Sequence, residues 1–197
     1  LSVNDFKTKY AGSYFGVIWA FIQPVVTVVV YWFVFQIAFK TDVINGYPFV
    51  LWLILGLVPW FFYSEAIIGG SNSLHEYNYL VKKVVFPISV LPIIKVISAL
   101  FIHLFFISFT IILFIAYGYR PDLYIIQLIY YSFCILILVL GLSYLNASIV
   151  VFFKDMSQLI NILLQIGMWM TPIVWNKELI PKNLEWLFKL NPMYYIV

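Results

Sequence analysis

The apolar positions of this chain form long continuous runs, and the charged positions are confined to short segments between them. No Asp, Glu, Lys or Arg occurs within residues 10–39, 43–64, 96–119, 123–153 or 156–176. A helix needs about 20 apolar residues to cross roughly 30 Å of hydrocarbon, so each run is long enough to span a bilayer. The runs are continuous, whereas the strands of a membrane barrel alternate over about 10 residues. The pattern therefore predicts membrane-spanning helices.

These runs predict an all-α fold, a polytopic membrane helix bundle with five spans and the start of a sixth before Val197. The expected spans cover residues 15–39, 49–70, 88–117, 123–152 and 156–175. Pro24 is expected to kink the first, because proline inside a helix removes one backbone hydrogen bond. No internal repeat divides the chain, so residues 1–197 are expected to form a single transmembrane domain. Because it begins with Leu1 and stops within an apolar segment, we expect a fragment truncated at both ends.

Two polar segments carry further structural signals. Residues 1–13 predict an amphipathic helix in the headgroup plane, with Val3, Phe6 and Tyr10 on one face. The loop over 71–87 begins with Ser73 and has Glu76 three residues later. That spacing is typical of a capping box and predicts a short helix over 73–80.

Composition agrees with a membrane protein: 64% of the residues are hydrophobic and 10% are charged. Soluble domains carry about 25% charged residues, so a soluble protein is excluded. The net charge of +3 is small and scattered, which argues against a nucleic-acid partner. Because Cys134 is the single cysteine, the chain has no internal disulfide framework. No group of His, Cys or acidic residues has metal-ligand spacing, so no metal site and no cofactor are expected in this chain.

Basic residues in the short loops do not decide the orientation, because five fall on each side. With the N-terminus inside, Lys7, Lys9, Lys82, Lys83 and Lys154 would be cytoplasmic, and Lys40, Arg120, Lys177, Lys182 and Lys189 would face out.

Three ionisable side chains lie inside expected spans, where such groups are costly and usually paired or functional. Glu65 and Lys95 are candidates for an ion pair between the second and third spans, or for snorkelling to the interface. His103 lies deeper and is interpreted as a hydrogen-bonded packing residue.

Aromatic residues make up 21% of the chain. Many are expected in interfacial belts or in the core. Two groups stand at span ends, where they could instead line a pathway or gate on which the C–H faces of sugars stack: Trp60, Phe61 and Tyr63 in the first group, and Trp169, Trp175 and Trp186 in the second.

Four segments together resemble a known family. These are DFKTKYAGSYFGVIWAFIQP at 5–24, KKVVFPISVLP at 82–92, FFKDMSQ at 152–158, and MTPIVW at 170–175 with NPM at 191–193. In this order they are similar to the type-2 ABC transporter permeases that export bacterial polysaccharides and polyol phosphates, among them O-antigen, capsule and teichoic acid. The resemblance covers essentially the whole chain. Family members often have arginine where this chain has Lys7, Lys9 and Lys154, so the bidentate fork is lost.

The resemblance implies a permease without catalytic residues of its own. It implies a homodimer in the bacterial cytoplasmic membrane with a cytoplasmic N-terminus, and two copies of a separate ATPase subunit that binds ATP and Mg. It also implies that residues 71–87 form a cytoplasmic coupling loop and that residues 176–190 form an external re-entrant gate hairpin. The implied substrate is a lipid-linked polysaccharide or teichoic-acid polymer.

Specific residues take roles within that hypothesis. Six residues are candidates for contact with the ATPase: Ser73, Leu74, His75, Glu76, Tyr77 and Leu80. Four lysines are candidates for binding lipid phosphates or a glycan pyrophosphate: Lys7, Lys9, Lys82 and Lys83. The lysines have an alternative role in topology and lipid anchoring, since each is worth on the order of 1 kcal/mol near an anionic surface.

Other functions stay open at this point. A related permease for drugs or lipo-oligosaccharides has the same general pattern. A membrane transferase acting on lipid-linked sugars would need an acid–base pair, and His103 and Asp122 have no partner at useful spacing. A secondary carrier would need more midplane charges or an inverted repeat. No GxxxxGK[ST] phosphate loop occurs, so ATP hydrolysis would need another subunit.

Overall fold

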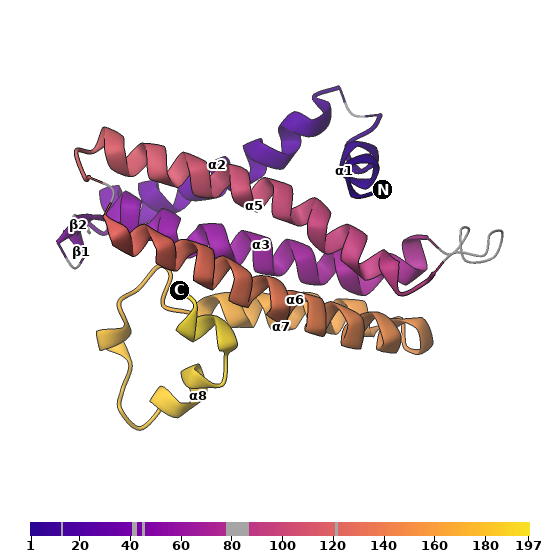
Figure 1. Ribbon diagram of the computed structural model, residues 1–197. Coiled ribbons are helices and arrows are strands. Elements are labelled where there is room, and N and C mark those ends of the chain that lie inside the picture. The colour runs from indigo at the N-terminus through magenta and orange to yellow at the C-terminus, as the bar shows by residue number, and fades with distance from the viewer. Residues whose placement is uncertain (13, 41–42, 45, 78–86, 121) are drawn as a thin grey trace.

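The computed structural model describes residues 1–12, 14–40, 43–44, 46–77, 87–120 and 122–197. The described chain is a bundle of long helices that run side by side along one axis (Figure 1). Among the described residues, four helices are long and apolar enough to cross a membrane. The predicted all-α membrane bundle is confirmed at this level.

The N-terminal part consists of a short helix and a first long one. Helix α1 (Ser2–Lys9) is shorter than the predicted 1–13. A 3-10 turn η1 (Gly16–Ile18), helix α2 (Trp19–Trp32) and a π-helical turn η2 (Phe33–Ala38) then form one continuous apolar segment. This segment matches the predicted first span and contains Pro24 within α2.

A small hairpin connects the first long segment to the second. Strand β1 (Val43–Ile44) pairs antiparallel with β2 (Tyr47–Pro48), between the first and second predicted spans. Gly46 has φ +84°. Since glycine adopts positive φ at no steric cost, it allows this tight reversal.

Helix α3 (Phe49–Glu76) is the centre of the bundle. In its most apolar 18-residue window, 61% of the residues are buried, compared with 6% in the first span. The helix continues six residues past the predicted end at 70. At 1.5 Å per residue its length is about 42 Å, so it is longer than the roughly 30 Å apolar core of a bilayer.

Two long helices cover α3. They are α5 (Val90–Ala116) and α6 (Ile126–Phe152), the latter preceded by a 3-10 turn η3 (Leu123–Ile125). Their bounds agree with the third and fourth predicted spans. Helix α6 approaches α3 closely at Gly70, and there the Ser143 hydroxyl donates a hydrogen bond of 3.2 Å to the Ala66 carbonyl.

Helix α7 (Met156–Trp169) has 14 residues, so the predicted fifth span over 156–175 is wrong at its C-terminal end. A helix of this length rises about 21 Å, less than a bilayer core. Pro172 explains the early end, because the residue before a proline is disfavoured in the helical region.

The segment after α7 contains three short helical pieces and returns to the bundle. They are η4 (Lys177–Leu179), α8 (Glu185–Lys189) and η5 (Pro192–Tyr195). The Asn191 amide closes the excursion by donating to the Gly167 carbonyl at 3.0 Å and to the Thr171 hydroxyl at 2.8 Å. The two segments that bracket the expected hairpin are therefore held together by direct hydrogen bonds.

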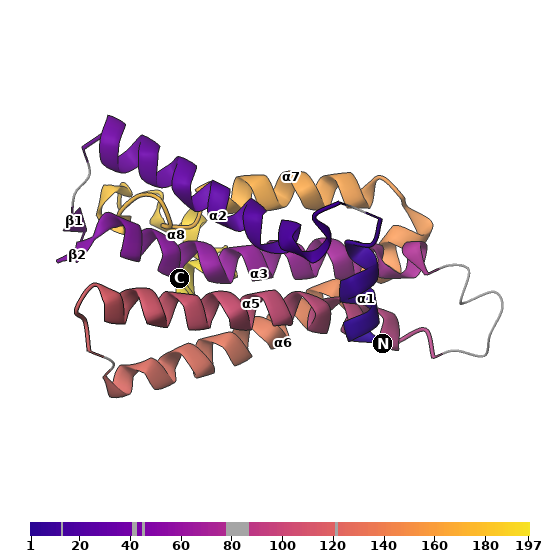
Figure 2. The same cartoon turned by 90° about the horizontal axis from the view of Figure 1, so that it is seen from above.

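The connections alternate between the two ends of the bundle. Figures 1 and 2 show α1, the end of α3 and the turn between α6 and α7 at one end. The β1–β2 hairpin and the turn between α5 and α6 lie at the other end. We name the first of these the α1 end.

Candidate functional site: a charged junction at the α1 end

A network of charged side chains joins α1 to the long helices. The Asp5 carboxylate forms an ion pair with Lys95 on α5, and its Oδ1 atom lies 2.8 Å from Lys95 Nζ. The same ammonium group lies 2.7 Å from the Glu76 carboxylate in the last turn of α3. Asp5 is only 6% exposed although it belongs to a short terminal helix. Lys95 therefore links three helices at one point, and Figure 2 shows α1 lying across the bundle there.

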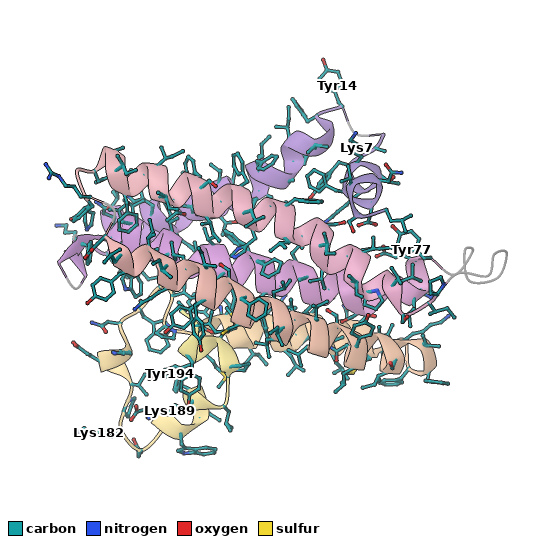
Figure 3. The ribbon with its side chains drawn as sticks, viewed as in Figure 1. Lys7, Tyr14, Tyr77, Lys182, Lys189 and Tyr194 are labelled. Atoms are coloured by element: carbon teal, nitrogen blue, oxygen red, sulfur yellow. The ribbon has the colours of Figure 1, made fainter. Side chains whose placement is uncertain are left out.

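Neutral groups reinforce this contact. The Tyr77 hydroxyl, just past the end of α3, donates to Asp5, and Lys95 Nζ lies 5.0 Å from the Tyr77 ring centroid. Ser98 donates to the Ser2 carbonyl at 2.9 Å. Figure 3 shows Tyr77 at the same end of the bundle as Lys7 on α1. We call Ser2, Asp5, Glu76, Tyr77, Lys95 and Ser98 the α1 junction.

A second ion pair holds the C-terminal end of α1. Lys9 pairs with Glu65 on α3, and both side chains are about two-fifths exposed. The predicted pair between Glu65 and Lys95 is wrong. Helix α1 folds back over α3 and α5 and supplies an opposite charge to each, so Glu65 pairs with Lys9 and Lys95 pairs with Asp5, while Glu76 at the end of α3 is the second partner of Lys95.

The electrostatics of α1 follow from these pairs. Burial alone would raise the pKa of Asp5, but hydrogen bonds from Lys95 and Tyr77 outweigh it and hold the pKa below its usual value. Burial alone would lower the pKa of Lys9, but the Glu65 carboxylate raises it above its usual value. Both shifts favour the charged forms, the Asp5 carboxylate and the Lys9 ammonium group.

The residues predicted to contact an ATPase have a different local structure from the one expected. Ser73 does not cap a separate helix: it lies inside α3, is fully buried and donates to the Gly70 carbonyl at 2.6 Å. The α-helix continues through this point because α6 packs over Gly70 and Ser73 remains in the core. His75 and Glu76 are exposed and Leu74 is half-buried. Leu80, Lys82 and Lys83 lie outside the described residues.

The two aromatic groups differ in burial. Trp60 and Tyr63 are buried at 4% and 8% exposure, and Phe61 is half-buried, so they pack within the bundle. Trp169 and Trp186 are 56% and 62% exposed. Trp175 donates to the Trp169 carbonyl at 3.1 Å and contacts the Phe188 ring edge-on. The three tryptophans of the second group therefore lie at the end of α7 and in the segment that follows it.

The remaining candidate residues lie on α1, α5 and α6. Lys7 is exposed on α1 and Cys134 is half-buried on α6. His103 is buried, but neither ring nitrogen has a hydrogen-bond partner among the described residues, so the prediction that it is hydrogen-bonded is wrong. Within the same residues no group of His, Cys, Asp and Glu could hold a metal ion.

The sequence analysis missed Asp5 and Ser98 as members of the site. One signal was available: Asp5 is an acidic residue in the expected interfacial helix, in a chain that places Lys95 inside an expected span. The chemistry of the α1 junction suits it for mechanical linkage of α1 to the ends of α3 and α5.

Comparison with known proteins agrees with this architecture. The family described as ABC-2 type transporter matches residues 1–197. The chain is 27% identical over 191 residues to the O-antigen export system permease protein RfbA of Klebsiella pneumoniae, covering 96% of this chain and 73% of that protein. It is 28% identical over 192 residues to the protein of the same name from Myxococcus xanthus, with the same coverage.

Proposed function

Because the chain belongs to the ABC-2 type transporter family, we propose that it is the membrane permease of an ATP-driven exporter for a lipid-linked cell-surface polysaccharide. The observation that carries this proposal is the similarity to O-antigen export permeases over 96% of the chain. The bundle agrees with it, since four helices suit a membrane and no catalytic pair is present among the described residues at the α1 junction.

In this proposal the α1 end faces the cytoplasm of a bacterial cell, and the N-terminus lies there. Helix α3 would project beyond the hydrocarbon at this end, so that its last turns and the residues that follow, up to 87, would contact the ATPase. A continuous helix is a stiffer lever than the separate short helix that the sequence indicated. Leu74, His75 and Glu76 are the described residues that would make the contact, and Lys7 would reach lipid phosphates.

The opposite end then faces outward, and the segment over 176–190 serves as a re-entrant gate. The length of α7 supports this role, because the helix ends after about 21 Å, which is less than the thickness of a bilayer core. The hydrogen bonds of Asn191 to Gly167 and Thr171 would hold the base of the gate while its exposed tryptophans contact the passing glycan. Five segments would then enter the membrane, and the fifth of them, α7, would cross it only in part.

The functional unit would be a homodimer with two ATPase subunits, which bind ATP and Mg. The exposed face of α7 supports a shared pathway: Gln158 and Gln165 are exposed and Asn161 is half-buried, at helical spacing on one face. Amides facing lipid would be costly. A polar pathway between two copies would satisfy them, with Trp60 and Tyr63 forming the packed wall behind it.

A permease for drugs or lipo-oligosaccharides is the second candidate, because it would use the same junction. A transferase is less well supported, because it would need an acid–base pair and the described charged residues at the junction already form ion pairs with one another. Transport of a defined substrate separates these functions.

The test is export by proteoliposomes that contain the full-length permease and its ATPase. We expect ATP-dependent transfer of a lipid-linked O-antigen-type glycan and none of a cationic drug. Leu74→Asp should lower ATP-driven export at least tenfold, because it puts a charge on the proposed ATPase contact. Tyr117→Asp, in the exposed turn at the opposite end, is the matched control and should keep export near wild type. Drug transport without glycan transport would overturn the proposal.

A further inference from the structure

A crevice lies over the central helix α3, between α5 and α6. It consists of two adjoining cavities, an outer one of about 360 Å³ and an inner one of about 80 Å³, and Leu55, Thr110 and Leu128 line both. Leu55 is 41% exposed, although Ile54 and Leu57 on the same helix are 5% and 0% exposed. At this place α5 and α6 therefore leave α3 uncovered.

The arrangement of the helices explains the opening. Figure 2 shows α5 and α6 diverging toward the end opposite the α1 end, where the outer cavity reaches Tyr119 and Arg120 in the turn between them. The same view shows α2 and α7 on the other side of α3. Because the proposed pathway between two copies lies along α7, the crevice would face the lipid of the membrane.

The depth of the crevice suits a single hydrocarbon chain. Along α6 the lining extends from Ile125 in the outer cavity to Ile135 in the inner one, which at 1.5 Å per residue is about 15 Å. One leaflet is half of a roughly 30 Å apolar core, so the crevice is as deep as the acyl chains of one leaflet. Aliphatic side chains make up much of the inner wall: Leu55, Val58, Ile107, Leu128 and Ile135.

The polar side chains of the inner wall do not require a polar ligand. The Thr110 hydroxyl donates to the Phe106 carbonyl at 2.7 Å. Both ring nitrogens of His103 are closed off from the cavity by burial. Tyr131 and Ser132 add one hydroxyl each at the edge on α6. The inner cavity is therefore mainly a site for hydrocarbon.

The mouth of the crevice carries the groups that a lipid headgroup needs. Tyr47 and Tyr119 pack against each other there with ring centroids 5.2 Å apart, and Tyr124 completes the aromatic part of the lining. Tyrosine is typical of the membrane interface, because its ring is apolar and its hydroxyl is polar. Arg120 and Asp122 belong to the same lining, and neither forms an ion pair with another described residue.

Charge complementarity selects the type of headgroup. A purely anionic headgroup would gain the Arg120 guanidinium group, which binds phosphate well, but it would also meet the Asp122 carboxylate. A headgroup with both a phosphate and an ammonium group offers one partner to each charge. The Asp122 carboxylate accepts from the Leu123 amide at 2.6 Å and keeps lone pairs for an ammonium donor.

We propose that the crevice between α5 and α6 binds one zwitterionic phospholipid, with an acyl chain over Leu55 and its phosphate and ammonium groups at Arg120 and Asp122. The lipid comes from the leaflet at the end opposite the α1 end and covers the part of α3 that the two helices leave open. The site is additional to the export of a glycan, since it requires only that the bundle spans a membrane.

The test uses the full-length permease with its ATPase in phosphatidylglycerol nanodiscs. A trace of lipid carries a photoreactive diazirine at the end of one acyl chain, and this probe is phosphatidylethanolamine in one sample and phosphatidylglycerol in the other. Mass spectrometry maps the crosslinks. We expect phosphatidylethanolamine to label Ile107 and Ser132 in the inner cavity about ten times more than phosphatidylglycerol does, the usual effect of one hydrogen bond to a charged group.

Ile137 is the internal reference. It lies on α6, is 55% exposed and belongs to neither cavity lining, so both probes should label it equally. Two outcomes would overturn the site. One is no crosslink at Ile107 and Ser132, which would mean that no acyl chain enters the crevice. The other is the same ratio of the two probes at these residues as at Ile137, which would mean that the headgroup is not recognised.

A pair of matched variants tests the charge at the mouth. Asp122→Asn removes the carboxylate but keeps a residue that caps a helix equally well, so the turn before α6 should be retained. The preference for phosphatidylethanolamine at Ile107 should then disappear. Asp155→Asn replaces the exposed aspartate that precedes α7 at the other end, and should leave the preference unchanged. Equal effects of the two variants would contradict the site.

Discussion

Replacing Lys95 with methionine should release α1 from the bundle. The substitution keeps the length of the side chain but leaves the Asp5 carboxylate, 5% exposed, without its cation. Removing one partner of a buried ion pair costs about 3 kcal/mol or more. Since each 1.4 kcal/mol is a factor of ten, opening of α1 should become on the order of a hundredfold more frequent. Hydrogen exchange of the backbone amides over 2–9, followed by mass spectrometry in nanodiscs, measures this directly.

Lys189→Met is the matched control. It removes the same type of side chain from an ion pair with Glu185, but both partners are more than two-fifths exposed. Exposed pairs contribute little to stability, so exchange over 2–9 should not change. Unchanged exchange of α1 in Lys95→Met would show that the α1 junction does not hold the helix.

Gly70→Ala should destabilise the contact between α3 and α6. A Cβ atom at Gly70 would lie 2.3 Å from the Ser143 Oγ and 2.5 Å from its Cβ. These atoms are close to the α6 backbone and cannot move away as the end of a long side chain would. Overpacking of this type costs about 1–3 kcal/mol. The midpoint of unfolding in an SDS titration should fall accordingly.

The chain offers a control for this substitution at a glycine of α6 that lies outside this contact. Gly141 lies on α6, and a Cβ atom there would meet no atom within 4 Å. Gly141→Ala should be neutral or slightly stabilising, because alanine favours helix over glycine. If both alanine variants lowered the midpoint equally, the close approach at Gly70 would not be the cause.

The sequence predicted the long helices well because each depends on a local property, a charge-free apolar run. Helix α5 begins two residues after and ends one residue before the bounds of the predicted third span, and α6 begins three residues after the predicted start of the fourth span and ends at its predicted last residue. The predicted end of α3 at residue 70 was wrong, because Gly69 to Ser73 look like a polar loop when they are read alone. In the bundle these small residues allow α6 to approach, and Ser73 is satisfied by the Gly70 carbonyl.

The ion pairs of the junction could not be predicted in the same way. Pairing of Glu65 with Lys95 was the obvious choice from two charges in neighbouring spans. Each of the two residues has a partner on α1, Lys9 for Glu65 and Asp5 for Lys95, and the position of α1 depends on the turn at Gly12 and Gly16, which both have positive φ. A chain reversal of this kind changes which charges meet without changing the apolar pattern. The short α7 was missed for a related reason, because Pro172 interrupts a run that stays apolar.

The central claim is that the α1 end of the bundle faces the cytoplasm and contacts the ATPase through the end of α3. Single cysteines placed in a Cys134→Ser background test it in intact cells, with His75→Cys at the α1 end and Tyr117→Cys at the other. We predict that a membrane-impermeant maleimide labels position 117 and not position 75, and that a bismaleimide joins position 75 to the ATPase subunit. Labelling of position 75 from outside, with no crosslink to the ATPase, would contradict the account.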